Sequence, residues 1–340
     1  MKTSKKLIIV LLVCLVTLGG AICIGSVRLS LSDVLHVLLY KLFGMKLPEG
    51  FSSTTIAILW NLRIPRALCA FFVGAALAVS GSVMQSVLQN PLASSYTLGV
   101  SSGASLGAAL VITGLINIPI STFITLPIVG FVFGLGTVFL AVFLTKKFDQ
   151  GFHNQTVILV GMVLGLFVNA LLTIVSALSK ESIQLLITWQ MGSFSSRGWK
   201  YVAIIGPITV LTSLFIMRYH KEMDMLTFGE DTASTMGVDT KKVKLKLFIL
   251  SALLTGISVC FTGIIGFVDL IAPHVIRKIF GPSHKLLLPM SALFGGAFMM
   301  VTDTVARTVL SPLELPVGAI TALIGAPFFG YIFFSKRKSA

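Results

Sequence analysis

Long apolar runs separated by short polar segments dominate this chain from end to end. A helix that crosses a bilayer needs about 20 predominantly apolar residues, and runs of about that length recur along most of the sequence. The pattern predicts an all-α, polytopic membrane protein with about ten transmembrane helices, forming one transmembrane domain over residues 1–340. We place the spans at 7–25, 64–88, 95–115, 122–145, 156–178, 200–219, 244–262, 268–280, 287–308 and 316–334.

Two of these runs need comment. The first, 7–25, follows a basic start and is longer than the 7–15-residue core of a signal peptide, so we interpret it as a retained span. The run at 268–280 is short and is entered through glycines, so we expect it to cross the membrane only in part. Short or broken helices of this kind occur in the working regions of transporters.

Three connections are long enough to hold structure of their own. Residues 26–62 contain an amphipathic stretch from Leu29 to Leu42, and residues 179–199 contain a predicted short surface helix over Ser182–Trp189. We expect both segments to be external. The loop at 220–243 is the main internal connection.

Composition strengthens the membrane prediction. Hydrophobic residues make up 55% of the chain and charged residues 11%, whereas soluble domains carry about 25% charged residues. The net charge of +14 does not indicate a nucleic-acid partner, because the charges lie in short clusters between apolar runs. With the N-terminus inside, 17 of the 26 lysines and arginines face the cytoplasm. This bias predicts a multi-pass protein of the cell membrane with both termini cytoplasmic.

The sequence lacks the motifs of several kinds of active site. It has no phosphate loop of the form G-x-x-x-x-G-K-[ST] and no H-E-x-x-H motif. Its four cysteines lie inside apolar runs without a C-x-x-C spacing, and its five histidines are scattered. We therefore predict no catalytic residues, no metal site and no cofactor. The chain is expected to be a transport subunit rather than an enzyme, and a membrane-embedded enzyme is the disfavoured reading.

A transporter without a nucleotide site needs another source of energy. One alternative is a secondary transporter driven by an ion gradient, which is expected to hold several ionisable groups near mid-membrane. The candidates are few, and most of them lie toward the ends of the predicted spans: Asp269, His274, Arg277, Asp303 and Arg307. The other alternative is a subunit that depends on separate ATPases.

Four segments, in order along the chain, carry a family resemblance. They are Arg63-Ile-Pro-Arg66 with Gly74-Ala-Ala-Leu-Ala-Val-Ser-Gly81, Gln85, Asn90-Pro-Leu-Ala93 and Leu98-Gly-Val-Ser-Ser-Gly-Ala104; Gly229-Glu-Asp-Thr-Ala-Ser-Thr-Met-Gly-Val238; Gly263-Ile-Ile-Gly-Phe-Val-Asp-Leu-Ile-Ala-Pro-His274 with Arg277 and Gly281; and Asp303 to Arg307 with Glu314-Leu-Pro-Val-Gly318 and Gly325-Ala-Pro-Phe328. Over roughly residues 10–334 the chain resembles the FecCD family of ABC importer permeases, which serve ferric siderophores, haem and cobalamin. Asp269 departs from the family pattern, which more often has glycine there.

The resemblance implies ten helices per subunit and a pore on the axis of a permease dimer, formed with an identical or paralogous second subunit. It also implies two cytoplasmic ABC ATPase subunits and an extracytoplasmic substrate-binding protein. A ferric siderophore is the commonest load in the family, so we expect an iron chelate, with haem or cobalamin as alternatives.

The resemblance also suggests roles for individual residues. Family arginines that match Arg63, Arg66 and Arg307 pair with glutamates of the binding protein, which suits the planar guanidinium. Alternatively, these arginines snorkel to lipid phosphates or fix helix ends. The predicted ATPase-coupling residues lie in the internal loop, which could also be an ordinary solvated loop: Gly229, Glu230, Asp231, Ala233, Gly237 and Val238.

Residues of the transport pathway are harder to recognise. In the family the fifth and tenth helices line it, which here are about 156–178 and 316–334. The polar residues of the first are Asn169, Thr173 and Ser176. We expect Asn90-Pro91 to end the second span, because proline disfavours helix in the residue before it. His274 could be pH-sensitive or bind a metal, but a lone histidine is more often structural.

Overall fold

The structure of the protein is a computed structural model that describes residues 3–337 except 26, 28, 49, 50, 117, 119 and 120. The described residues form helices and turns and contain no strand, so the all-α prediction is confirmed. The helices are α1 (Thr3–Cys23), α2 (Leu31–Phe43), α3 (Ser53–Ala57), the π-helical η1 (Ile58–Arg63), α4 (Ile64–Val87), α5 (Val100–Ile112), α6 (Thr122–Phe148), α7 (Asn154–Leu178), the 3-10 turn η2 (Lys180–Ser182), α8 (Ile183–Gln190), α9 (Trp199–Met217), α10 (His220–Leu226), α11 (Glu230–Thr235), α12 (Thr240–Thr262), α13 (Val268–Phe280), α14 (His284–Thr308) and α15 (Val317–Arg337).

Each of the ten predicted spans corresponds to one of these helices. Among the described residues, seven helical segments are long and apolar enough to cross a membrane, while α5 and the Val317–Phe328 part of α15 are shorter apolar helices. The predicted short segment is α13, and the predicted surface helix at 182–189 is α8. The internal loop folds into α10 and α11. The protein is thus a multi-pass helical bundle.

Helix α4 forms the centre of the bundle, and its small residues explain how neighbouring helices approach it. A Cβ atom added to Gly74 would lie 2.2 Å from the carbonyl oxygen of Gly295 in α14. One added to Gly81 would lie 1.9 Å from the carbonyl oxygen of Asp269 in α13. Lipid provides no hydrophobic drive for helix association, so close backbone contact through small residues is what holds such helices together.

The N-terminal side of α4 differs from the prediction. A connection was expected up to residue 62, but α3, η1 and α4 form one continuous helical segment over Ser53–Val87. The π-helical turn η1 lies directly before Pro65, which has no backbone N–H to donate. The wider turn accommodates the proline without breaking the helix.

The third span also begins later than expected. Helix α4 ends at Val87, and the Asn90 side chain accepts a hydrogen bond from the Leu92 backbone N–H at 2.9 Å, so the predicted break at Asn90-Pro91 is confirmed. Residues 95–99 were expected to be helical, but they form turns, and α5 starts after Gly99 at φ 78°. Hydrogen bonds from Ser94 and Ser95 to Asp269 hold this connection outside the helix.

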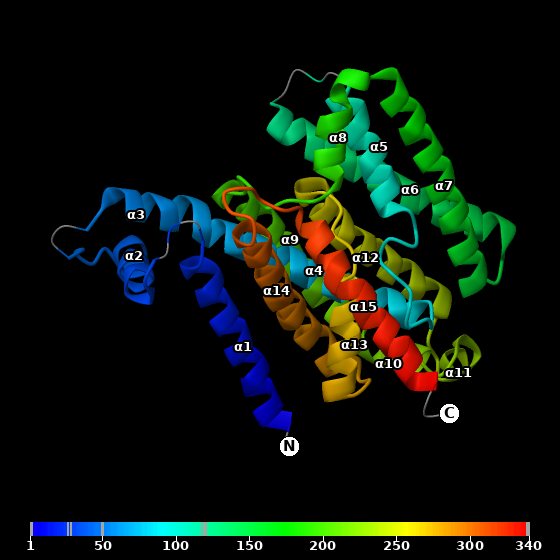
Figure 1. Ribbon diagram of the computed structural model, residues 1–340. Helices are drawn as coiled ribbons and strands as arrows, with labels where there is room; N and C mark the ends of the chain where they lie inside the picture. The colour runs from blue at the N-terminus through cyan, green and yellow to red at the C-terminus, as the bar shows by residue number, and fades with distance from the viewer. Residues whose placement is uncertain are drawn as a thin grey trace.

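The two chain ends lie at the same end of the bundle, together with α10 and α11 (Figure 1). We call this the proximal end and the opposite one, where α8 lies, the distal end. At the distal end the backbone N–H groups of Val317 and Gly318 donate to the carbonyls of Gly192 and Met191. The orientation prediction counted Lys2, Arg28 and Lys338, which lie outside the described residues.

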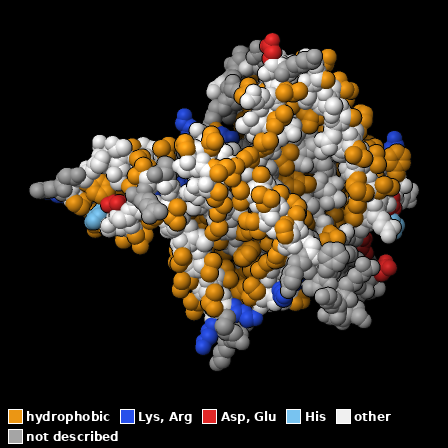
Figure 2. Space-filling view, in the orientation of Figure 1, with side chains coloured by type: hydrophobic (Ala, Val, Ile, Leu, Met, Phe, Trp, Pro, Cys, Tyr) orange, Lys and Arg blue, Asp and Glu red, His pale blue; other side chains and the backbone are white. Residues whose placement is uncertain are grey.

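The surface matches a lipid environment over much of its area. Figure 2 shows hydrophobic side chains spread over much of the visible face, with lysine and arginine side chains near its edges. Exposed leucines occur along α1 and α7; Leu15 is 67% exposed and Leu166 is 71% exposed. In water such a surface would favour aggregation, whereas lipid chains accommodate it.

Candidate functional site

The three predicted docking arginines lie near one another at the distal end, where helices α1, α4 and α14 meet. Arg66 is bidentate to Asp303, with Nε and Nη2 at 3.0 and 2.8 Å from the carboxylate oxygens. Its other edge donates to Glu314 at 2.8 Å and 3.1 Å. Asp303 is 2% exposed and Glu314 is 38% exposed. The Arg66 guanidinium therefore joins a buried carboxylate to one at the surface.

Arg307 belongs to the same cluster. It lies four residues after Asp303 on α14, with Nε 3.8 Å from the carboxylate, and its Nη2 donates to the carbonyl of Ala21 in α1. We call Arg66, Asp303, Arg307 and Glu314 the distal ion cluster. Its two positive and two negative side chains balance. The sequence did not single out Asp303 and Glu314 as partners, because they lie 237 and 248 residues from Arg66.

Arg63 has a different environment. It is 6% exposed, and its Nη1 donates to the carbonyls of Ile22 and Cys23 at 3.0 and 2.9 Å. Its Nη2 donates to the carbonyl of Val27. Ile22 and Cys23 belong to the last turn of α1, whose carbonyls have no partner within the helix, and Val27 lies in the connection that follows. Arg63 thus fixes the end of α1 against the start of α4.

The six predicted coupling residues lie together at the proximal end, in α11 and the turns that flank it. Gly229 and Gly237 have φ values of 107° and 89°, which favour glycine. Ala233 is fully buried, and Asp231 is exposed. The backbone N–H of Val238 returns to the carbonyl of Ala233 at 3.1 Å. We call α10, α11 and their turns the proximal hairpin.

A buried ion pair fastens this hairpin to the bundle. Lys244, in the first turns of α12, has a side chain that is 1% exposed. Its Nζ donates to Glu230 at 2.8 Å and to the carbonyl of Phe152 at 2.7 Å. A buried ammonium without such partners would be strongly destabilising. Sequence reasoning assigned Lys244 to a basic cluster and missed this role, because nothing in the local sequence distinguishes it from its neighbours Lys242 and Lys246.

A second set of contacts connects α10 to the ends of α4 and α14. The Asp224 carboxylate accepts hydrogen bonds from the backbone N–H and the Nδ1 of His284 at 2.8 and 2.6 Å. The other ring nitrogen of His284 contacts the Ser86 hydroxyl. Gln89 donates to the carbonyl of Leu226 at 2.9 Å. The proximal hairpin is therefore attached to three helices of the bundle.

Asp239 closes the hairpin and starts α12. Its carboxylate accepts the Lys242 backbone N–H at 3.1 Å and pairs with the Lys242 ammonium at 2.8 Å. These hydrogen bonds from Lys242 hold the pKa of Asp239 below its usual value. A carboxylate at a helix start also opposes the helix dipole favourably.

The predicted pathway residues lie on one stripe of α7. Asn169 and Thr173 are exposed and Ser176 is half-buried. Thr173 donates to the Asn169 carbonyl at 2.9 Å, and Ser176 donates to the Leu172 carbonyl at 2.7 Å. A different face of α7 packs on the chain; it includes Gly161, where an added Cβ would lie 2.5 Å from the Thr97 carbonyl oxygen. The stripe thus faces outward from this chain.

Asp269 is integrated into the fold rather than left free. It is 1% exposed, and one of its oxygens accepts hydrogen bonds from Ser94 Oγ, Ser95 Oγ and Ser95 N at 2.5, 2.8 and 3.0 Å. These bonds tie the turn before α5 to the first turn of α13. The described residues contain no group of three or more His, Cys, Asp and Glu side chains that could hold a metal ion.

Comparison with known proteins places these features in a family. The family model of the FecCD transport family matches residues 8–335. The cobalamin import system permease protein of Halobacterium salinarum is 37% identical over 298 residues, covering 88% of this chain and 79% of that protein. The Fe(3+)-citrate import system permease protein of Bacillus subtilis is 33% identical over 334 residues, covering 97% and 96%. A solved structure titled as an inward-facing conformation of a putative metal-chelate type ABC transporter is 30% identical, with a TM-score of 0.84, covering 98% of this chain and 99% of that one.

Proposed function

This chain belongs to the FecCD transport family, and from that premise we propose that it is the translocation-pore subunit of an ABC importer for a ferric siderophore or a similar iron chelate. It is an importer permease of the FecCD type, a class whose relatives here serve iron citrate and cobalamin. The family match across 8–335 carries the proposal, because it covers both the distal ion cluster and the proximal hairpin.

The substrate is tested by uptake. A deletion strain and the same strain with the gene restored are each supplied with a radiolabelled ferric siderophore, ferric citrate, haem or cobalamin. We expect restored uptake of a ferric chelate. If the gene restores uptake of cobalamin alone, cobalamin is the substrate and the iron proposal is wrong. The 37% identity to a cobalamin permease makes cobalamin the second candidate.

We propose that the importer has two cytoplasmic ABC ATPase subunits and that one of them binds the proximal hairpin of each permease subunit. The exposed Asp231 and the buried Ala233 give α11 one free face and one face fixed to the bundle, and the Lys244–Glu230 pair supports the fixed face. Cysteines at Asp231 and Ser234 should crosslink to the ATPase, whereas a matched cysteine at the exposed Thr188 of the distal end should not. Crosslinks at Thr188 alone would refute this arrangement and the assignment of the proximal end to the cytoplasm.

We propose that the binding protein docks on the distal ion cluster. Arg66 already has a buried partner in Asp303, so a carboxylate of the binding protein would compete only with the exposed Glu314. In this arrangement Arg63 and Arg307 support the docking surface by holding the end of α1. Glu314→Gln should then tighten binding of the binding protein, since it frees one edge of Arg66. The exposed Glu181 provides the control, Glu181→Gln; equal affinities in the two variants would contradict the docking proposal.

We further propose that a second permease subunit packs on α7 and α15, with the pathway on the axis between the two copies. The outward stripe of Asn169, Thr173 and Ser176 supports this placement. Cysteines placed at Asn169 should form a crosslink between the two permease subunits of the assembled importer. ATP-independent uptake driven by an ion gradient would instead favour a secondary transporter.

A further inference from the structure

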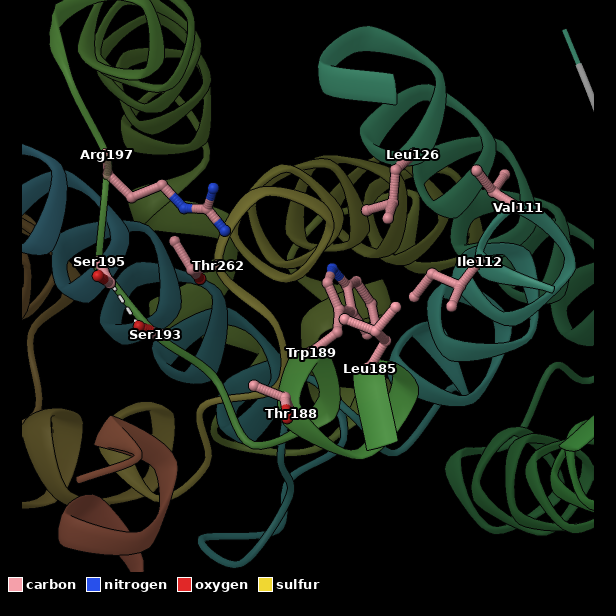
Figure 3. Close-up of a pocket in the computed structure, with 10 residues that line it drawn as sticks. All are labelled: Val111, Ile112, Leu126, Leu185, Thr188, Trp189, Ser193, Ser195, Arg197 and Thr262. Carbon is pink, nitrogen blue, oxygen red and sulfur yellow. Dashed lines mark hydrogen bonds between the residues drawn. The ribbon is translucent and has the colours of Figure 1, made fainter. Parts of the chain in front are cut away.

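A cavity of about 590 Å³ lies at the distal end, between α5, α6, α8 and the segment that leads into α9 (Figure 3). One side is apolar and is formed by Leu126, Leu185 and Trp189 together with the end of α5. The other side carries hydroxyl groups and Arg197, whose guanidinium extends toward the space in Figure 3. Among the described residues that line it, Arg197 is the one charged side chain and none is acidic.

Arg197 is held in place but is not neutralised. Its Nη1 donates to the Tyr201 hydroxyl at 2.7 Å, and its guanidinium carbon lies 4.6 Å from the centre of the Tyr201 ring. Its Nε is buried and has no hydrogen-bond partner among the described residues. These residues also provide no salt bridge to it. A fixed guanidinium with an unused donor favours an anion with paired oxygens, such as a phosphate.

A separate apolar groove lies beside this cavity, between α6, α9 and α12. It has a volume of about 230 Å³, and its lining has no polar surface. Ile257, Cys260 and Phe261 of α12 form its floor, while Ile128 of α6 and Ile204 of α9 form its sides. Ile128 is 53% exposed and Ile204 is 37% exposed. The groove is therefore open on the outer surface of the bundle, where lipid chains lie.

The cavity and the groove are neighbours on the bundle. Phe261 of the groove precedes Thr262 of the cavity in the chain, and Leu126 of the cavity precedes Pro127 of the groove. Tyr201 joins them in space, because its ring packs edge-on against Phe261 at 5.6 Å while it carries Arg197 on its face. An amphiphile could thus place a charged head at Arg197 and a chain along α12.

The depth of Arg197 in the bilayer fits a headgroup. Trp199 follows it by two residues and donates from Nε1 to the Trp60 carbonyl at 2.7 Å, with the two indole rings 4.9 Å apart. Tryptophan and tyrosine gather at membrane–water interfaces. At this depth Arg197 can meet a lipid headgroup, and its planar guanidinium suits the phosphate oxygens of that headgroup.

We propose that the cavity and the groove together are a binding site for one anionic phospholipid, with its phosphate on Arg197 and an acyl chain in the groove between α6, α9 and α12. A water-soluble phosphate would satisfy Arg197 but would leave the groove unused. The site lies away from the outward stripe of α7, and the proposal holds whichever substrate the importer carries.

The test uses the full-length permease in its assembled complex, purified in a mild detergent that retains native lipids. Native mass spectrometry measures phosphatidylglycerol bound per permease after titration with that lipid, and phosphatidylcholine provides the neutral comparison. We expect Arg197→Gln to weaken phosphatidylglycerol binding about tenfold or more, as for loss of a charge-assisted hydrogen bond. Arg218→Gln is the matched control, because Arg218 stacks on Phe215 at the other end of α9. It should bind like the wild type.

Two further measurements separate the lipid from a free anion. Ile128→Trp fills the groove from an exposed position, so it should fold normally and weaken the lipid while leaving Arg197 intact. Glycerol 1-phosphate, a headgroup without chains, should fail to displace the lipid at millimolar concentration. Unchanged lipid binding in Arg197→Gln overturns the proposal. Displacement by glycerol 1-phosphate with no effect of Ile128→Trp also overturns it, in favour of a site for soluble anions.

Discussion

The closest backbone contact of α4 gives a quantitative prediction. In Gly81→Ala the new Cβ would lie 1.9 Å from the carbonyl oxygen of Asp269, whereas an ordinary contact is 3.4–4 Å, so α4 and α13 must separate there by at least about 1.5 Å. The Asp269 carboxylate is held by three hydrogen bonds from Ser94 and Ser95 that have no slack of this size. The separation therefore disturbs both the α4–α13 contact and the turn before α5.

The magnitude follows from two opposing effects. Overpacking of a close contact costs typically 1–3 kcal/mol, while alanine in a helix gains about 0.5–1 kcal/mol over glycine. We expect a net loss of about 1–2 kcal/mol. At about 2–4 °C per kcal/mol this lowers the apparent melting temperature by roughly 2–8 °C.

Thermal unfolding of the purified permease in detergent, followed by size-exclusion chromatography, measures this shift. Gly136→Ala in α6 is the matched control, because a Cβ there meets no atom within 4 Å. It should melt at the wild-type temperature or slightly above it. If Gly81→Ala melts as high as Gly136→Ala, the close contact between α4 and α13 is not present in the protein and the reasoning fails.

Three further predictions concern charged groups. Lys244→Met removes the buried ammonium that joins Glu230 to the Phe152 carbonyl, and we expect the free energy of unfolding to fall by about 1–3 kcal/mol, less than for a fully buried pair because Glu230 is 24% exposed. Lys246→Met, at an exposed position of the same helix, should melt near the wild type, and equal melting temperatures of the two variants would contradict the role of the pair. Arg66→Met leaves Asp303, 2% exposed, with only the more distant Arg307, so the single variant should be less stable than Arg66→Met combined with Asp303→Asn. A double variant that melts lower than the single one would show that the two side chains act independently. Hydrogen bonds from Thr156, His153 and Gly151 hold the pKa of Asp149 below its usual value, so the carboxylate stabilises the fold above the unfolded pKa near 3.9 and this stabilisation is lost as pH falls through the lower folded pKa. Asp149→Asn should therefore lose less melting temperature than the wild type as the pH is lowered, and identical profiles of melting temperature against pH would refute the assignment.

Much of the fold could be predicted because the local sequence of each helix indicates where it lies. Apolar run length located all ten segments, and Asn90-Pro91 marked the end of α4. The prediction failed at the start of α4, because whether a π-helical turn absorbs Pro65 depends on packing against α1 and α2, which a local pattern does not contain. It also failed at residues 95–99, where the hydrogen bonds to Asp269 decide the path of the chain.

The partners of the charged residues could not be predicted from the sequence, for a different reason. The sequence placed Arg66, Arg307 and the internal loop at opposite ends of the bundle, because span counting fixes which end a residue occupies. It could not pair Arg66 with Asp303 or Asp224 with His284, since these pairs join helices that are far apart in the chain. The family resemblance supplied candidate residues and no internal geometry.

The continuous helical segment Ser53–Val87 has a mechanical consequence. Its 35 residues at 1.5 Å each make a rod of about 52 Å, against a hydrocarbon core of about 30 Å. Arg66 lies in the first half of the rod, and Ser86 lies at its far end, next to His284 and the hairpin. As a rigid lever it turns a tilt of about 5° into a displacement of roughly 4–5 Å at its far tip. Movement at one membrane surface thus reaches the other through a single element, without any chain of side-chain rearrangements between them.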